Sequence, residues 1–206
     1  TRFLMNLGNA LLTLYLLFYL KDALHLSDDA AEDSVFVLTA VYGLVTVVTA
    51  VVGGWWSDRV GRRKVFVIWS GLIAAAALMI FALVPTLPAA YVGAVVLGIG
   101  FGAYTAVDFA LITQVLPGAA DRAKDLGVIN IANALPQVFA PVLAGVLLWA
   151  VEAAGGGVES EGHGFSAGYF ALYLLAFLCS VPGAVFVSRI RGGAGAARNA
   201  GARHGG

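Results

Sequence analysis

The sequence has few charged residues and a single cysteine. Charged side chains make up 12% of its 206 residues, whereas soluble domains carry about 25%. Cys179 lies in an apolar run, which predicts a packing residue rather than a redox or metal-ligating group. The pattern His-Glu-x-x-His is absent, which argues against a metalloprotease. We therefore expect no enzyme activity, no catalytic or metal-ligating residue, no cofactor and no nucleic-acid partner.

Long hydrophobic runs dominate what is present. The chain is 60% hydrophobic with a mean hydropathy of +0.89, and a transmembrane helix needs about 20 mostly apolar residues. The sequence predicts an all-α membrane protein whose residues 1–191 form a six-helix bundle. Residues 192–206 are mostly Gly, Ala and Arg, which predicts a disordered tail. The six predicted spans cover residues 2–21, 35–56, 65–84, 88–116, 127–151 and 167–188.

The basic residues are distributed unevenly between the two sides of these spans. Lys21 falls on one side, and every other Lys and Arg falls on the opposite side. Positive charge marks the cytoplasmic side of membrane proteins, so we expect both termini there. The high Ala and Gly content hints at a bacterial plasma membrane. The basic residues assigned to the cytoplasmic side are Arg2, Arg59, Arg62, Arg63, Lys64, Arg122, Lys124, Arg189, Arg191, Arg198 and Arg203.

A charged turn between the second and third spans carries the most specific motif. We expect one helix to end near Gly54 and the next to start at Val65, with a tight turn between them. The pattern G-x-x-x-D-R-x-G-R-R-K resembles the signature loop of the major facilitator superfamily of secondary transporters. Its key residues here are Gly54, Asp58, Arg59, Gly61, Arg62 and Arg63.

The resemblance implies that this chain is one six-helix half of a transporter, and that the other half is missing. The run 88–116 lacks an intramembrane arginine, which favours the C-terminal half. Residues 126–137 (Leu-Gly-Val-Ile-Asn-Ile-Ala-Asn-Ala-Leu-Pro-Gln) resemble the eleventh helix of sucrose–proton and glycoside–cation symporters. In the superfamily the loop aspartate contacts a helix end of the other half, so Asp58 is implied as a gate residue. The alternative is a cationic loop that only sets topology.

Asp108 is a carboxylate within the fourth predicted span. Placing its charge in the membrane costs several kcal/mol unless the side chain faces a cavity, pairs with a base or takes up a proton. Such residues commonly mark proton relays or substrate sites, so we expect Asp108 to couple protons or contact substrate. The alternative is an interhelical ion pair, for which Arg2 is the candidate partner.

Two polar stripes occur at helical spacing. Side chains of this kind on a membrane helix must point at a cavity or at another helix, and amides suit hydroxyl-rich ligands because each offers a donor and an acceptor. Hydrogen bonding between helices explains either stripe alone, but the two together with Asp108 favour a central polar cavity, with Tyr104 as an aromatic candidate. The first stripe is Arg2, Asn6, Asn9 and Thr13, and the second is Asn130, Asn133 and Gln137.

The segment Gly98-Ile-Gly-Phe-Gly102 resembles a dinucleotide-binding fingerprint only superficially. It lies inside an apolar span with no strand before it, so we expect a surface for close helix packing.

These patterns favour half of a secondary transporter that moves a small polar solute, such as a sugar or glycoside, by proton-coupled alternating access. Its partners would be membrane lipid, the other half, the solute and the proton. One alternative is half of a drug–proton antiporter, and another is a six-span protein that acts as a homodimer. An intramembrane enzyme is least favoured, because an aspartyl protease needs two membrane carboxylates and Asp108 stands alone among the spans.

Overall fold

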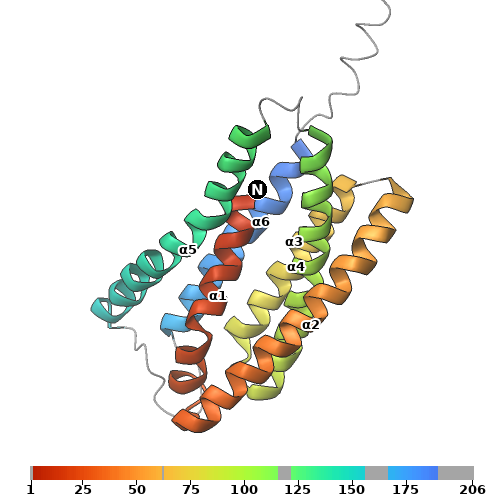
Figure 1. Cartoon of the computed structure of the whole chain (residues 1–206). Coiled ribbons are helices and arrows are strands. Elements are labelled where there is room, and N and C mark those ends of the chain that lie inside the picture. Colours follow the sequence, from red (N-terminus) through yellow and green to blue (C-terminus); the bar gives the residue numbers. More distant parts are fainter. Residues whose placement is uncertain (1, 62, 116–121, 156–166, 190–206) are drawn as a thin grey trace, which may run out of the picture.

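The computed structural model describes residues 2–61, 63–115, 122–155 and 167–189, and these form helices without strands. Five helices contain stretches long and apolar enough to cross a membrane, and the sixth contributes a shorter apolar segment, Ala167–Val181. The predicted all-α membrane fold is therefore confirmed. In chain order the helices are α1 (Arg2–Asp22), α2 (Asp28–Val60), α3 (Arg63–Leu83), α4 (Leu87–Val115), α5 (Arg122–Ala153) and α6 (Ala167–Arg189) (Figure 1).

Helix α2 is longer than predicted at both ends. Asp28 and Asp29 form its first turn, where carboxylates interact favourably with the positive end of the helix dipole. At the other end, Gly61 has a φ of 68° and its N–H donates to the Ser57 carbonyl oxygen at 3.0 Å. This left-handed cap requires a residue without a Cβ penalty. The predicted helix end near Gly54 was wrong because the charged residues that follow it continue the helix.

The charged turn is consequently much shorter than expected. Asp58 and Arg59 lie on the last turns of α2, and α3 starts at Arg63. Arg59 stacks over the ring of Trp55, one turn earlier, at 5.4 Å from the ring centroid. A Cβ on Gly54 would make only ordinary contact with Ala106, so no close approach depends on that glycine. Arg62, the side chain of Arg63 and the tail 192–206 lie outside the described parts of the chain.

The six helices form two interleaved groups of three. Helix α4 packs against α2 and α3, whereas α1 packs against α5 and α6, and α3 and α6 pack against each other at the centre. The two groups in chain order, α1–α3 and α4–α6, are therefore related by exchange: α4 packs against the last two helices of the first group, and α1 packs against the last two helices of the second group. In Figure 1, α2 and α5 lie on opposite flanks of the bundle.

Tight contacts of α4 come from glycines on two of its faces. A Cβ on Gly100 would lie 2.5 Å from the backbone nitrogen of Ala74 on α3. A Cβ on Gly98 would lie 3.0 Å from the carbonyl oxygen of Tyr42 on α2. The first distance is shorter than real Cβ contacts and the second is tighter than most of them, so the predicted close-packing surface at residues 98–102 is confirmed.

An aromatic cluster joins α1, α3 and α6 near the end of α1. The rings of Phe81, Tyr169 and Tyr173 surround Tyr19 with centroids 5.2–5.9 Å away, in edge-to-face geometry. The Tyr19 hydroxyl donates to the Phe81 carbonyl oxygen at 3.0 Å, and the Tyr169 hydroxyl donates to the Asp22 carboxylate. These contacts fix α1 on the α3–α6 pair.

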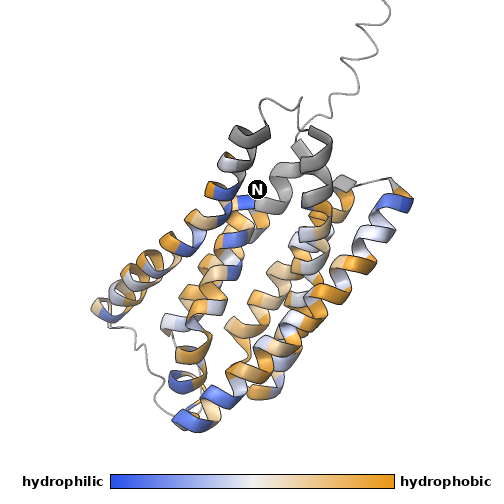
Figure 2. Ribbon diagram, in the orientation of Figure 1, coloured by the Kyte–Doolittle hydropathy of each residue, from blue (hydrophilic) through white to orange (hydrophobic). Residues whose placement is uncertain are grey.

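Helices α2 and α5 expose broad apolar faces. In Figure 2 hydrophobic residues run along both helices, and hydrophilic ones gather at the turn between α1 and α2 and at the tip of α2. Such surfaces suit lipid or another apolar protein surface rather than water. The largest exposed side chains on α2 include Phe36, Leu44, Val47 and Val51, and those on α5 include Val128, Ile131, Val138, Val142 and Trp149.

Candidate functional site

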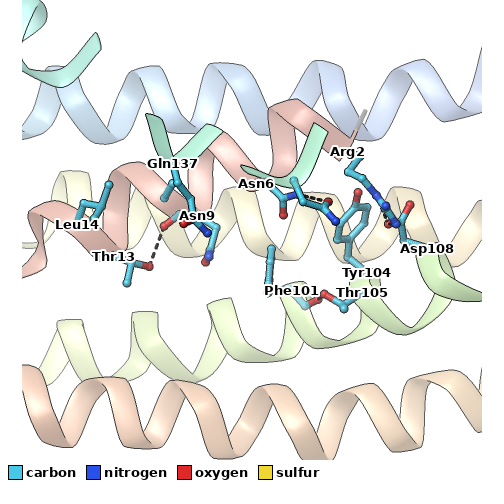
Figure 3. Close-up of a pocket in the computed structure, with 12 residues that line it drawn as sticks. Arg2, Asn6, Asn9, Thr13, Leu14, Phe101, Tyr104, Thr105, Asp108 and Gln137 are labelled. Atoms are coloured by element: carbon cyan, nitrogen blue, oxygen red, sulfur yellow. Dashed lines mark hydrogen bonds and ion pairs between the residues drawn. The ribbon is translucent and has the colours of Figure 1, made fainter. Parts of the chain in front are cut away.

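A cavity of about 470 Å³ lies between α1, α4 and α5. The close-up in Figure 3 shows polar side chains reaching into it from α1 and α4, with Gln137 above them. Because α1 and α4 make few direct backbone contacts, side chains from both helices line the space between them. The lining residues are Arg2, Asn6, Asn9, Ala10, Thr13, Leu14, Phe101, Tyr104, Thr105, Asp108, Asn133 and Gln137.

An ion pair between Arg2 and Asp108 links α1 to α4 across one end of the cavity. The Arg2 Nε donates to the Asp108 Oδ2 at 2.6 Å, and the Nη2 donates to the same oxygen. The two side chains are 14% and 22% exposed. Pairing offsets the cost of holding a carboxylate in an apolar surrounding. The alternative that the sequence left open, an interhelical ion pair with Arg2, is therefore the observed geometry (Figure 3).

The amides of the α1 stripe form hydrogen bonds to two other helices. The Asn6 Nδ2 donates to the Asn133 Oδ1 on α5 at 3.1 Å. The Asn9 Oδ1 accepts a hydrogen bond from the Tyr42 hydroxyl on α2 at 3.0 Å. Each amide thus keeps one polar end for the cavity, and the two ends differ: Asn6 keeps its oxygen and Asn9 keeps its nitrogen.

Two threonines on the cavity wall donate their hydroxyl hydrogens within their own helices. Thr13 donates to the Asn9 carbonyl oxygen at 2.8 Å, and Thr105 donates to the Phe101 carbonyl oxygen at 2.8 Å. A threonine bonded to the carbonyl four residues earlier has only lone pairs left. Both hydroxyls can therefore accept hydrogen bonds from a bound molecule.

The structure brings most of the predicted site residues together and separates one of them. Asn6, Asn9, Tyr104, Asp108, Asn133 and Gln137 all line the cavity. Tyr104 is 3% exposed, with its ring 6.2 Å from that of Phe101. Asn130 lies three residues before Asn133, but it does not line the cavity and is exposed. Its inclusion among the cavity candidates was wrong.

Sequence reasoning missed Phe101 and Thr105 on α4. They lie seven and three residues before Asp108, the spacing that places side chains on one helix face. Counting back from Asp108 would have found them, but an apolar ring and a single threonine give no polar signal of their own.

The residues of the charged turn lie apart from this cavity. None of the cavity-lining residues comes from the segment between Gly54 and Arg63, and Asp58 is exposed at the end of α2. If these residues act in transport, they must act through the position of the helices rather than by touching a molecule in the cavity.

Comparison with known proteins places the chain in a family. The sequence model of the Major Facilitator Superfamily matches residues 1–203. The class C tetracycline resistance protein of Escherichia coli is 37% identical over 128 residues, which are 62% of this chain and 31% of that protein. The matched stretch thus spans about a third of the relative's length. Matched along almost its entire length, this membrane-embedded helical chain belongs to the major facilitator superfamily of transporters.

Proposed function

We propose that this chain is one six-helix half of a secondary transporter, the C-terminal half, and that it moves a small hydroxyl-bearing solute such as a sugar or glycoside. Transport would be coupled to protons and would proceed by alternating access between the two halves. The observation that carries the proposal is the mixed donor and acceptor lining of the cavity between α1, α4 and α5.

This lining suits hydroxyl groups in particular. Thr13, Thr105 and the Asn6 oxygen accept hydrogen bonds, whereas the free amide nitrogens of Asn9 and Asn133 donate them. A hydroxyl group does both, so a polyhydroxylated solute can pair with acceptors and donors in turn. A wholly apolar solute would leave these groups without partners, which costs free energy.

Proton coupling is assigned to Asp108. When it is ionised, its charge and that of Arg2 compensate each other across the cavity. Protonation removes the carboxylate charge and weakens the link between α1 and α4. The proton and the distance between these two cavity walls would then be linked, which is the requirement for coupling proton movement to a conformational change.

The apolar faces of α2 and α5 are proposed to meet the other half and membrane lipid. They flank the cavity on both sides, and their exposed side chains are largely Val, Leu and Ile. We infer that the Gly61 end of the bundle is cytoplasmic because all basic residues except Lys21 belong to that side. The membrane is proposed to be a bacterial plasma membrane.

Asp58 is proposed to act as part of the gate at that end, together with Arg59 and the Gly61 turn. Asp58 lies apart from the cavity, so its replacement should change the conformational balance more than solute affinity. In Asp58→Asn we expect slower transport with solute binding retained. Loss of binding with unchanged turnover of the bound solute would reject the gate assignment.

A second candidate is export of a drug in exchange for protons. It is favoured by the similarity to a tetracycline resistance protein, although that match covers only part of both chains. The Arg2–Asp108 pair is compatible with either direction of coupling, so the candidates must be separated by measurement.

The deciding experiment uses liposomes that contain the full-length transporter and an internal pH dye. Sugars, glycosides and tetracycline are added outside in turn. Acidification evoked by a sugar and lost in Asp108→Asn would support the symporter and the role of Asp108. Proton exit evoked by tetracycline would favour the antiporter. Acidification that survives Asp108→Asn would leave a transporter but remove Asp108 as its proton carrier.

A further inference from the structure

Tyr42 lies behind the cavity wall, where its hydroxyl bonds to one lining residue and its ring packs beside another. It lies on α2 and does not line the cavity, but its hydroxyl donates to the Oδ1 of Asn9, which does. An asparagine amide presents an acceptor at one end and a donor at the other. Since the oxygen is occupied by Tyr42, the nitrogen is the end left for a bound molecule.

We propose that Tyr42 is a positioning residue for solute recognition: it fixes the Asn9 amide so that its nitrogen donates to an oxygen atom of the solute. The inference rests on the proposed transport function and adds a selectivity element to it. Without the Tyr42 hydroxyl, the amide could turn over and present its oxygen instead. Asn9 would then offer the solute a hydrogen-bond acceptor where it now offers a donor.

The position of Tyr42 is set by α4 rather than by α1. Its ring packs 6.4 Å from that of Phe101, and its backbone carbonyl lies where a Cβ on Gly98 would come within 3.0 Å. Gly98 thus permits the close approach of α2 and α4 that brings the phenol to Asn9. These contacts hold the phenol independently of Asn9, so we expect the amide to adjust to the hydroxyl.

Neighbouring Asn6 presents the other end of its amide to the cavity. Its nitrogen donates to Asn133, so its oxygen is left for the cavity. Asn6 and Asn9 are three residues apart on one helix face. Together they present one acceptor beside one donor, which fits a solute that offers a hydroxyl hydrogen to Asn6 and an oxygen to Asn9. Turning the Asn9 amide over would place two acceptors side by side and weaken the binding of such a solute.

The test is transport kinetics of Tyr42→Phe in the full-length transporter, with methyl β-glucoside and tetracycline as probes. The variant keeps the ring and removes the hydroxyl. We expect KM to rise about fivefold, as for one lost neutral hydrogen bond, with kcat changed less than about twofold. Tyr169→Phe is the matched control because it also removes a tyrosine hydroxyl bonded to an α1 side chain, at residues that do not line the cavity. Its KM should not change.

A double-variant cycle tests whether Tyr42 acts through Asn9. In the Asn9→Ala background, Tyr42→Phe should have no further effect on KM, because the amide it positions is gone. An equal rise in KM in both backgrounds would overturn the proposal, as would an unchanged KM in Tyr42→Phe alone.

A measurement without solute separates this inference from the proposed function. Infrared spectra of protein labelled with ¹³C at the tyrosine ring carbon that bears the hydroxyl report whether a phenol donates a hydrogen bond. The Tyr42 band, identified by its loss in Tyr42→Phe, should shift in Asn9→Ala. If no probe is transported by the wild type, the proposed function fails, and an unshifted band would then reject the Tyr42 inference as well.

Discussion

Helices α4 and α5 form two walls of the same cavity, but they are held in different ways. Half of the residues in the most apolar stretch of α4 are buried, against 17% in α5. The backbone of α4 touches α2 and α3 through its glycines, whereas a Cβ added to Gly127 or Gly145 of α5 would meet no other residue within 4 Å. One wall is therefore held by dense backbone contacts, and the other packs more sparsely within this unit.

This difference indicates that moving α5 costs less free energy than moving α4. Shifting α4 would disturb dense contacts on two sides, and packed interiors resist such changes. Helix α5 contains Pro136 and Pro141, which remove backbone hydrogen bonds and permit bending. Figure 1 shows α5 leaning away from α1 toward its C-terminal end. The hydrogen bonds from Asn6 to Asn133 and from Tyr15 to the Pro141 carbonyl hold α5 to α1.

The strongest test of this comparison removes one partner of the ion pair that ties α1 to the α4 wall. Arg2→Leu leaves Asp108 without its partner across the cavity, so we expect the free energy of unfolding in detergent to fall by about 3 kcal/mol. The double variant Arg2→Leu/Asp108→Leu should recover most of that loss. A double variant as unstable as the single one would show that the charge is not the cause.

Crowding the α4 contact should have the next largest effect. In Gly100→Ala the new methyl group meets the backbone of α3, so we expect a loss of about 2 kcal/mol in unfolding free energy. Gly145→Ala on α5 is the matched control, since open space surrounds that position. Its stability should stay equal or rise slightly, because alanine favours helix. Equal losses in both variants would contradict the difference between the walls.

Breaking the amide link to the α5 wall should cost less. Asn6→Leu removes the hydrogen bond to Asn133, and hydrogen bonds between membrane helices average about 0.6 kcal/mol. The control is Asn130→Leu on α5, which changes an exposed amide outside the cavity and should have no measurable effect on stability. A loss as large as that for Arg2→Leu would mean that α5 is held as firmly as α4.

The smallest effect is expected when a backbone donor is restored in α5. Pro141→Ala supplies an N–H that can bond to the Gln137 carbonyl. We expect about a twofold slowing of amide exchange around residue 141, equivalent to about 0.4 kcal/mol, with no change in α4. Mass spectrometry of deuterated peptides measures both helices in one sample. Unchanged exchange in α5 would indicate that Pro141 does not loosen it.

The sequence predicted the helices better than their ends. Apolar runs located all six helices because hydropathy marks the part of each helix that lies in the membrane. It does not show how far a helix continues beyond that part. Asp28 and Asp29 read as a polar loop, although carboxylates in a first turn favour the helix. Asp58 and Arg59 read as a turn, although only Gly61 breaks the helix.

The site was predicted in part for a similar reason. Helical spacing placed Asn6 and Asn9 on one face, and Asn133 and Gln137 on another, and the cavity joins both faces. Spacing within a helix cannot tell which of its residues a neighbouring helix will enclose, so Asn130 was included although it is exposed outside the cavity. The pairing of Tyr42 with Asn9 depends on the offset between α1 and α2, for which a single sequence carries no signal.

Helix α2 is continuous and connects the charged turn to Tyr42. From Asp28 to Val60 it contains no proline, and the helical rise of 1.5 Å per residue puts Asp58 about 24 Å along the axis from Tyr42. A straight helix transmits tilt over that distance with little loss. If the proposed gate moves the charged tip, a tilt of α2 would carry that movement to Tyr42, the proposed positioning residue for Asn9. No described residue of the tip lines the cavity, so such coupling would run through the tilt of α2.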